Sequence, residues 1–136
     1  MEINVSLIPA AGAVCLLASV LEGWILVLMR YMRISSLKKI FPGYKYLVRS
    51  HVDYAIMAGL LFVIYLVIVS MNLPVSKAAI VALIVGAIYN PFGFLLQALK
   101  PDITESDSFM IKIAILIGFI PATYGFGAVA MAIILR

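Results

Sequence analysis

The sequence contains one histidine, His51, whose imidazole can act as an acid, a base or a metal ligand. At helical spacing, Tyr54 and Tyr65 share one stripe with it. Asp53 is close enough in the chain to orient the ring, or is simply solvated. One histidine without a cysteine partner argues against a zinc site made by this protein alone, whereas a haem needs only one axial imidazole. A lone histidine can also be purely structural, so both interpretations stay open.

Glu22 is the one acidic residue deep inside an apolar stretch. A charge near the centre of a bilayer costs ~3 kcal/mol on insertion scales. We therefore expect this carboxyl to be protonated, to be paired or to face a wet cavity. Cys15 and Ser19 make a small, weakly polar face on the same side of the helix. An ion pair with Arg49 or with a neighbouring helix is one interpretation, and a functional carboxyl is the other.

A second set of informative residues is a stripe of small and amide side chains. Gly86, Asn90, Gly93 and Gln97 follow one another at spacings of four, three and four, which places them on one helix face. Small residues let helix backbones approach, and a buried amide needs a partner. This stripe is therefore expected to face protein or a cavity, with Asn90 either bonded across an interface or contacting a ligand.

Two of the predicted helices, the third and the fourth, each contain an internal proline. Pro91 cannot donate to the carbonyl of Ala87, and Pro121 cannot donate to that of Ile117. Each leaves an acceptor that another group must satisfy, and both helices are expected to kink near mid-membrane.

The elements that position these residues follow from composition. Of the 136 residues, 65% are apolar and only 12% charged, and the mean hydropathy is +1.19. These values predict an all-α fold, an integral membrane four-helix bundle, forming a single transmembrane domain in the lipid bilayer. The predicted helices cover about 7–29, 47–73, 75–99 and 109–135, with a basic loop at 30–46. Asn72, Leu73 and Pro74 end the second helix, and Ser106 or Ser108 is expected to cap the fourth.

The charge distribution predicts the orientation. Six of the ten basic residues lie between Arg30 and Arg49, in the loop joining the first two spans and at the start of the second span. Such a cluster indicates a cytoplasmic loop rather than nucleic-acid binding, and it is compatible with anionic lipid headgroups. We expect a multi-pass protein of the inner (cytoplasmic) membrane with both termini outside.

Several short motifs resemble those of a known family. The bacterial styrene oxide isomerases and, more loosely, the hydroxylaminobenzene mutases are small four-helix membrane proteins with a similar order of features. The matching residues are Phe41-Pro42-Gly43-Tyr44, Arg49-Ser50-His51, Asn90, Gly93, Pro101 and the run from Pro121 to Met131.

This resemblance implies a haem b between the subunits of a homotrimer, with His51 as the iron ligand. Arg49 and Lys45 would pair with the haem propionates. Ferric iron would act as a Lewis acid on a small lipophilic substrate such as an aryl epoxide. Ring opening to a benzylic cation and a hydride shift then give an aldehyde, so the expected activity is intramolecular isomerisation. The candidate catalytic residues in the pocket are Tyr54, Asn90 and Glu22, of which Tyr54 and Glu22 are not part of the family pattern.

The sequence also departs from the family. Met57 and Phe94 stand where the isomerases carry a substrate-placing Asn and Tyr, and Gly86 stands near their acidic residue. The alternative is a non-enzymatic bundle, either a small subunit, a haem-binding protein or a transporter-like protein. In that interpretation Glu22 and Asn90 serve assembly or proton handling.

Overall fold

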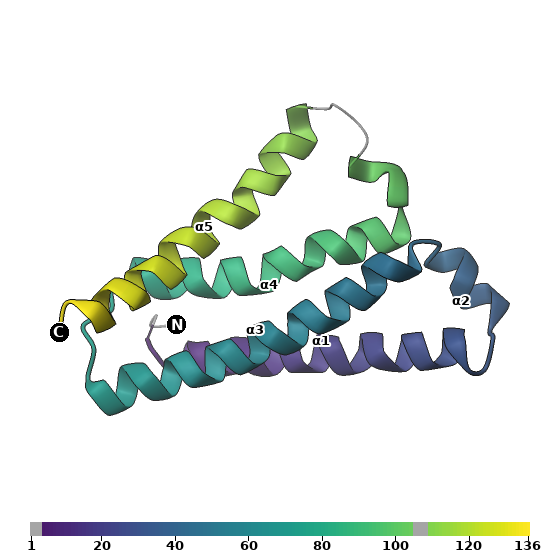
Figure 1. Ribbon diagram of the computed structural model, residues 1–136. Coiled ribbons are helices and arrows are strands. Elements are labelled where there is room, and N and C mark those ends of the chain that lie inside the picture. Colours follow the sequence, from purple (N-terminus) through teal and green to yellow (C-terminus); the bar gives the residue numbers. More distant parts are fainter. Residues whose placement is uncertain (1–3, 105–108) are drawn as a thin grey trace.

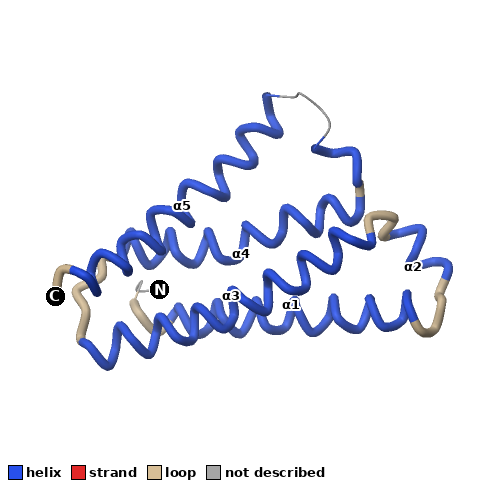
Figure 2. Tube along the Cα trace, in the orientation of Figure 1, coloured by secondary structure: helices blue, strands red, loops and turns tan. Residues whose placement is uncertain are grey.

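The computed structural model describes residues 4–104 and 109–136, and these form helices joined by short connections (Figures 1 and 2). No strand occurs in this described part, so the all-α prediction is confirmed. Ser106 and Ser108, the predicted caps of the last helix, lie outside the described residues. The elements are α1 (Leu7–Arg30), α2 (Ser35–Ile40), α3 (Tyr44–Met71), α4 (Lys77–Leu99), the 3-10 helix η1 (Pro101–Thr104) and α5 (Phe109–Ile134).

Four of these helices are long and apolar enough to cross a membrane, as predicted. They contain 24, 28, 23 and 26 residues. At ~1.5 Å per residue they are about 35 to 42 Å long, which exceeds the ~30 Å of a hydrocarbon core. The boundaries differ in detail, because α3 begins at Tyr44 and α4 at Lys77 rather than at 47 and 75. The predicted loop 30–46 contains the short helix α2.

The turn between α3 and α4 follows the predicted punctuation. Asn72 adopts a left-handed conformation with φ of 50°, which an asparagine tolerates better than most residues. The amide of Leu73 then bonds back to the carbonyl of Ile68 at 3.0 Å and closes the helix end. Ser76 starts α4, since its hydroxyl accepts from the amide of Ala79 at 3.2 Å.

The helices pack in the order α1, α3, α4, α5, and α1 also touches α4. Figure 1 shows both described ends of the chain at one end of the molecule, with α2 and η1 at the other. The main core lies where α1, α3 and α4 meet. Its buried members include Ile8, Cys15, Leu61, Leu83 and Ala87.

α5 packs on α4 through small residues. A Cβ atom on Gly86 would lie 2.4 Å from the Cα of Ala122, and one on Gly125 would lie 2.3 Å from the backbone nitrogen of Leu83. The two backbones are therefore almost in contact at this crossing. Beyond it α5 diverges from α4 toward its own N-terminus, so the pair forms a wedge (Figure 1).

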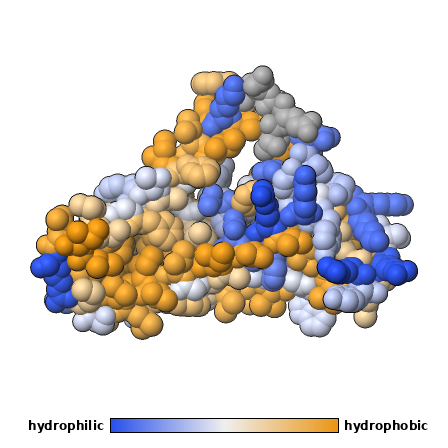
Figure 3. Space-filling model, viewed as in Figure 1, coloured by the Kyte–Doolittle hydropathy of each residue, from blue (hydrophilic) through white to orange (hydrophobic). Residues whose placement is uncertain are grey.

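The outer surface is apolar along the helices. Large exposed side chains include Leu17, Leu21, Trp24, Leu66 and Phe119. Figure 3 shows apolar surface over much of the visible face, with hydrophilic groups gathered toward the end that carries α2. This distribution matches a protein whose solvent along the helices is lipid.

Candidate functional site

Glu22 lies in the interior of the helix assembly. The side chain is 4% exposed, and its Oε1 accepts a hydrogen bond of 2.7 Å from the hydroxyl of Ser50 on α3. Its Oε2 is buried and has no hydrogen-bond partner within residues 4–104 and 109–136. The partner of this carboxyl is thus Ser50, not Arg49 as one interpretation of the sequence proposed. One oxygen atom remains able to take a proton or to meet a further donor.

Hydroxyl and thiol groups from α1 and α3 surround the interrupted turn of α4. The Sγ of Cys15 lies 4.0 Å from the carbonyl of Ala87, the acceptor that Pro91 leaves free. The phenol of Tyr54 donates to the carbonyl of Ile88 at 3.2 Å. The hydroxyl of Ser50 also lies 3.2 Å from the carbonyl of Pro91. Of these contacts, that of Cys15 reaches the carbonyl that Pro91 leaves free, and α4 continues as one helix through Pro91.

Tyr54 was a predicted pocket residue, and its surroundings define a different immediate role. The side chain is 5% exposed and belongs to the main core. Because its hydroxyl is already bonded to the Ile88 carbonyl, Tyr54 fastens α3 to α4 in this chain.

His51 is oriented by α1. Its Nδ1 lies 2.8 Å from the carbonyl oxygen of Ser19 and 3.1 Å from the hydroxyl of the same residue. A carbonyl only accepts, so Nδ1 carries the hydrogen and donates it. The Ser19 hydroxyl in turn donates to the His51 carbonyl at 3.0 Å. In the neutral ring Nε2 then holds the lone pair, and within the described residues it has no hydrogen-bond partner.

The imidazole of His51 lies against a glycine. A Cβ atom on Gly23 would be 3.1 Å from the Cε1 atom of the ring, closer than most real contacts. Any larger residue at this position would crowd or rotate the ring. Gly23 and Ser19, four residues apart on α1, therefore form the surface on which the ring rests.

His51 and Ser50 turn to different sides of α3. Ser50 is fully buried toward α4, whereas the His51 side chain is half-buried beside α1. Successive residues of a helix are separated by about 100°. The imidazole therefore sits on the outer side of the α1–α3 seam, next to the buried carboxyl of Glu22 but not in the same cluster.

The remaining predicted ligands of a cofactor point elsewhere. The guanidinium of Arg49 lies 5.6 Å from the ring centre of Phe94 on α4, and the amine of Lys45 lies 4.9 Å from that of Tyr46. Arg49 precedes His51 by two residues and thus occupies nearly the opposite side of α3. Within one chain these two cations are not brought beside His51. The Ser19 carbonyl, not Asp53, orients the ring.

The predicted amide stripe faces α5. Asn90, Gly93 and Gln97 line a cavity of about 190 Å³ inside the wedge between α4 and α5, together with apolar residues such as Phe119. The prediction that this face meets protein or a cavity is confirmed. Asn90 is consequently separated from His51 by the thickness of the helix assembly, because His51 packs on α1.

The arrangement offers one metal-binding group of the imidazole type. No group of three or more His, Cys, Asp or Glu side chains able to hold a metal ion occurs in the described part of the chain. A haem needs one axial imidazole and is compatible with this donor set. Comparisons with known protein families, with curated proteins and with solved structures find no match to this chain.

Three residues of this region have roles that sequence reasoning missed: Ser50 as the partner of Glu22, Ser19 as the acceptor that orients His51, and Gly23 as the surface under the ring. Counted from the observed ends at Arg30 and Tyr44, Glu22 and Ser50 lie about 12 Å and about 9 Å deep, so the antiparallel pair brings them to nearly the same level. The predicted helix start at 47 puts Ser50 only about 5 Å deep, so depth gave no signal for this contact.

Proposed function

We propose that this protein is a haem b-dependent membrane isomerase in which His51 binds the iron through Nε2. The observation that carries the proposal is the 2.8 Å hydrogen bond from Nδ1 to the Ser19 carbonyl. Histidines that bind metals usually donate their other ring N–H to a carbonyl or carboxylate, which fixes the tautomer and the ring orientation. The resemblance to the styrene oxide isomerases supports the same assignment.

The surroundings of the ring fit a flat apolar group. Gly23 puts no side chain against the Cε1 edge of the imidazole, and exposed Val20 and Val27 lie about one turn from Gly23 on α1. Ala55, exposed on α3, lies one turn beyond His51. His51 is half-buried, and it does not line the cavities of about 450, 190 and 520 Å³ found in the described part of the chain. A porphyrin on Nε2 would therefore lie against the outer face and be covered by another copy, in keeping with a homotrimer.

When bound, ferric haem supplies a Lewis acid for the oxygen of a small lipophilic substrate such as an aryl epoxide. The chain holds the imidazole in one tautomer through the carbonyl of Ser19. An epoxide and its aldehyde are isomers, so the conversion consumes no oxidant, reductant or external nucleophile. The exposed Lys45 and Arg49 would reach the propionates of a haem only if that haem is bound by another subunit. Asn90 would likewise contact the substrate only across a subunit boundary.

The proposed orientation places the basic 30–49 region in the cytoplasm and both termini outside, in the inner membrane. The positive-inside rule supports it, since the connections on the other side carry few basic residues. The fold is compatible with this orientation, because the loop 30–46 and the α4–η1 connection lie at the same end. The amide of Gly43 bonds to the carbonyl of Ala98 at 3.0 Å there.

An absorption spectrum tests the proposal. Protein purified in detergent after haem-replete expression should show a Soret band, and His51→Ala should lose it while keeping its helical circular dichroism. Gly23→Val should also lose the band, because the new side chain occupies the surface under the ring. Gly59→Val is the matched control, since a Cβ atom on Gly59 has no neighbour within 4 Å. A colourless wild-type protein refutes the haem assignment. Conversion of aryl epoxides to aldehydes is then assayed directly.

A second function is favoured by one observation, the partnerless Oε2 of buried Glu22. In this alternative the protein is a non-enzymatic bundle that uses Glu22 in a proton path or in assembly with another subunit. Glu22→Gln would then abolish proton flux into liposomes or release the protein from a larger complex on native purification. An unchanged flux and an unchanged native size in that variant would leave only a structural role for the carboxyl.

A further inference from the structure

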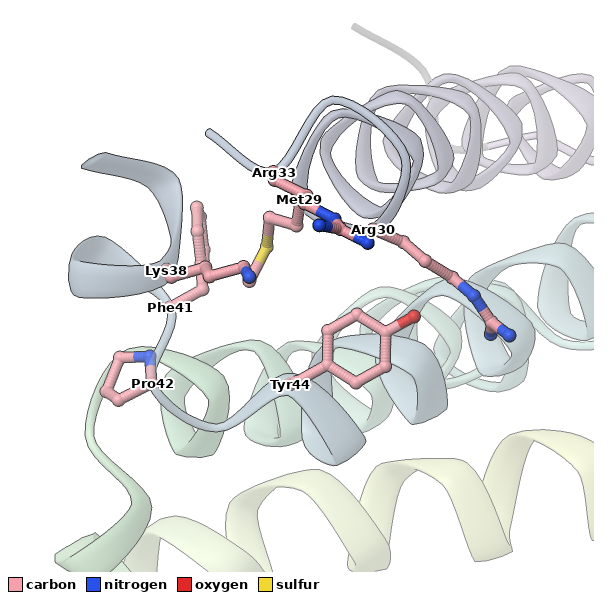
Figure 4. Close-up of a pocket in the computed structure, with 7 residues that line it drawn as sticks. All are labelled: Met29, Arg30, Arg33, Lys38, Phe41, Pro42 and Tyr44. Atoms are coloured by element: carbon pink, nitrogen blue, oxygen red, sulfur yellow. The ribbon is translucent and has the colours of Figure 1, made fainter. Parts of the chain in front are cut away.

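A basic cavity lies at the end of the molecule that carries α2. It has a volume of about 450 Å³ and opens between the C-terminus of α1, the helix α2 and the start of α3. Figure 4 shows basic side chains and the Tyr44 ring around the same space. The lining residues are Met29, Arg30, Arg33, Lys38, Phe41, Pro42 and Tyr44.

The charge of this basic cavity is not balanced by the chain. Three of the lining residues, Arg30, Arg33 and Lys38, are cationic, and none is acidic. Within residues 4–104 and 109–136, these three cations make no ion pair. Their one described contact is that of Arg30, whose guanidinium lies 5.9 Å from the ring centre of Tyr31. Three cations held around one space attract an anion, above all one near a surface of low dielectric constant.

The backbone holds the walls of the basic cavity in place. Arg33 has φ of 54°, a left-handed conformation that non-glycine residues adopt only when the surroundings impose it. The amide of Ile34 bonds to the carbonyl of Leu28 at 3.3 Å and closes this turn on α1. On the other side, Gly43 is bonded to Ala98 of α4. The segment that carries the cationic groups is therefore hydrogen-bonded to α1 at one end and to α4 at the other.

The position and the remaining lining residues indicate the source of the anion. The basic cavity lies where α1 ends after its apolar span, at the level where lipid headgroups are found. Met29, Phe41 and Pro42 add an apolar wall beside the cations. A phosphate joined to glycerol and acyl chains satisfies both parts, whereas a free phosphate satisfies only the charged one.

We propose that the basic cavity binds a phosphate group, carried by an anionic phospholipid of the surrounding leaflet. Arg30, Arg33 and Lys38 contact the phosphate oxygens, and Tyr44 donates to them through its hydroxyl. The lipid thereby joins α1, α2 and α3 at this end. This site is separate from His51 and is independent of haem binding.

Lipid binding to the full-length, detergent-purified protein tests the proposal. Short-chain phosphatidylglycerol, phosphatidylcholine, glycerol 3-phosphate and inorganic phosphate are titrated separately, with binding followed by native mass spectrometry and by the shift in unfolding temperature. Phosphatidylglycerol should bind and phosphatidylcholine should not. If glycerol 3-phosphate or inorganic phosphate binds as tightly as phosphatidylglycerol, the phosphate site stands and its ligand is soluble. Absence of binding by any anionic probe overturns the site.

Charge-matched variants locate the binding. Arg30→Gln with Lys38→Gln should weaken phosphatidylglycerol binding about thirtyfold, as expected for two cations near a membrane surface. Lys39→Gln with Lys100→Gln removes the same charge at the same end but outside the basic cavity, and should change binding less than about threefold. An equal loss in both pairs overturns the proposal in favour of diffuse attraction. If the double variant does not fold, Lys38→Gln alone, on the exposed helix α2, is compared with Lys39→Gln alone.

Discussion

The crossing of α4 and α5 makes a quantitative prediction. An alanine at position 86 would place its Cβ atom 2.4 Å from the Cα of Ala122, and neither atom can move without its helix. Because carbon atoms in contact are ~3.5 Å apart, the helices must separate by about 1 Å. Overpacking of this kind costs ~1–3 kcal/mol. Gly125→Ala should behave alike, since its Cβ atom would lie 2.3 Å from a backbone nitrogen.

Gly127 on the same helix is the matched control. A Cβ atom there has no neighbour within 4 Å, so Gly127→Ala gains the ~1 kcal/mol of helix propensity without a clash. All three variants gain this propensity and only two of them clash, so unfolding in mixed micelles, followed by circular dichroism, should separate Gly86→Ala and Gly125→Ala from Gly127→Ala by about 1–3 kcal/mol. Equal stabilities for the three variants would show that the helices do not cross as described.

Three further predictions concern the other contacts. Ser50→Ala should destabilise the protein by ~1–3 kcal/mol in the same unfolding assay, because it removes the hydrogen-bond donor of the buried Glu22. If the effects of Ser50→Ala and Glu22→Gln were additive in a double-mutant cycle, this pairing would be contradicted. Gly43→Ala should be destabilising, since its Cβ atom would lie 2.6 Å from the carbonyl oxygen of Gln97; retention of full stability would disprove this close approach. Cys15, buried in the core, should react with a maleimide only after unfolding, and rapid labelling of the folded protein would be inconsistent with the helix packing.

The sequence was sufficient for the main architecture. Length and apolarity predicted the four spans, and Asn72 with Pro74 predicted the end of α3, because local chemistry alone decides these features. The spacing of Asn90 and Gln97 predicted the face of α4 that meets α5, since helical periodicity survives folding unchanged. These properties depend on neighbours in the chain and not on distant partners.

The site was less predictable because its contacts join distant residues. That Glu22 bonds to Ser50 and not to Arg49 depends on the rotation of α1 against α3, which composition does not determine. The orientation of His51 likewise depends on a backbone carbonyl, that of Ser19, which every residue carries and no motif distinguishes. The left-handed turn at Arg33 gave no signal, since glycine or asparagine is the usual residue there.

α5 is attached to the other helices by a different kind of contact from the one that joins α1, α3 and α4. α1, α3 and α4 are joined by polar side chains around Pro91, whereas α5 is attached through close-packed small residues near one end of the wedge. At that crossing α5 meets α4 through Gly86 against Ala122 and through Gly125 against Leu83. The amide of Asn90 lies in this wedge among apolar side chains, so a lipid-soluble compound that entered from the acyl-chain side would meet that amide.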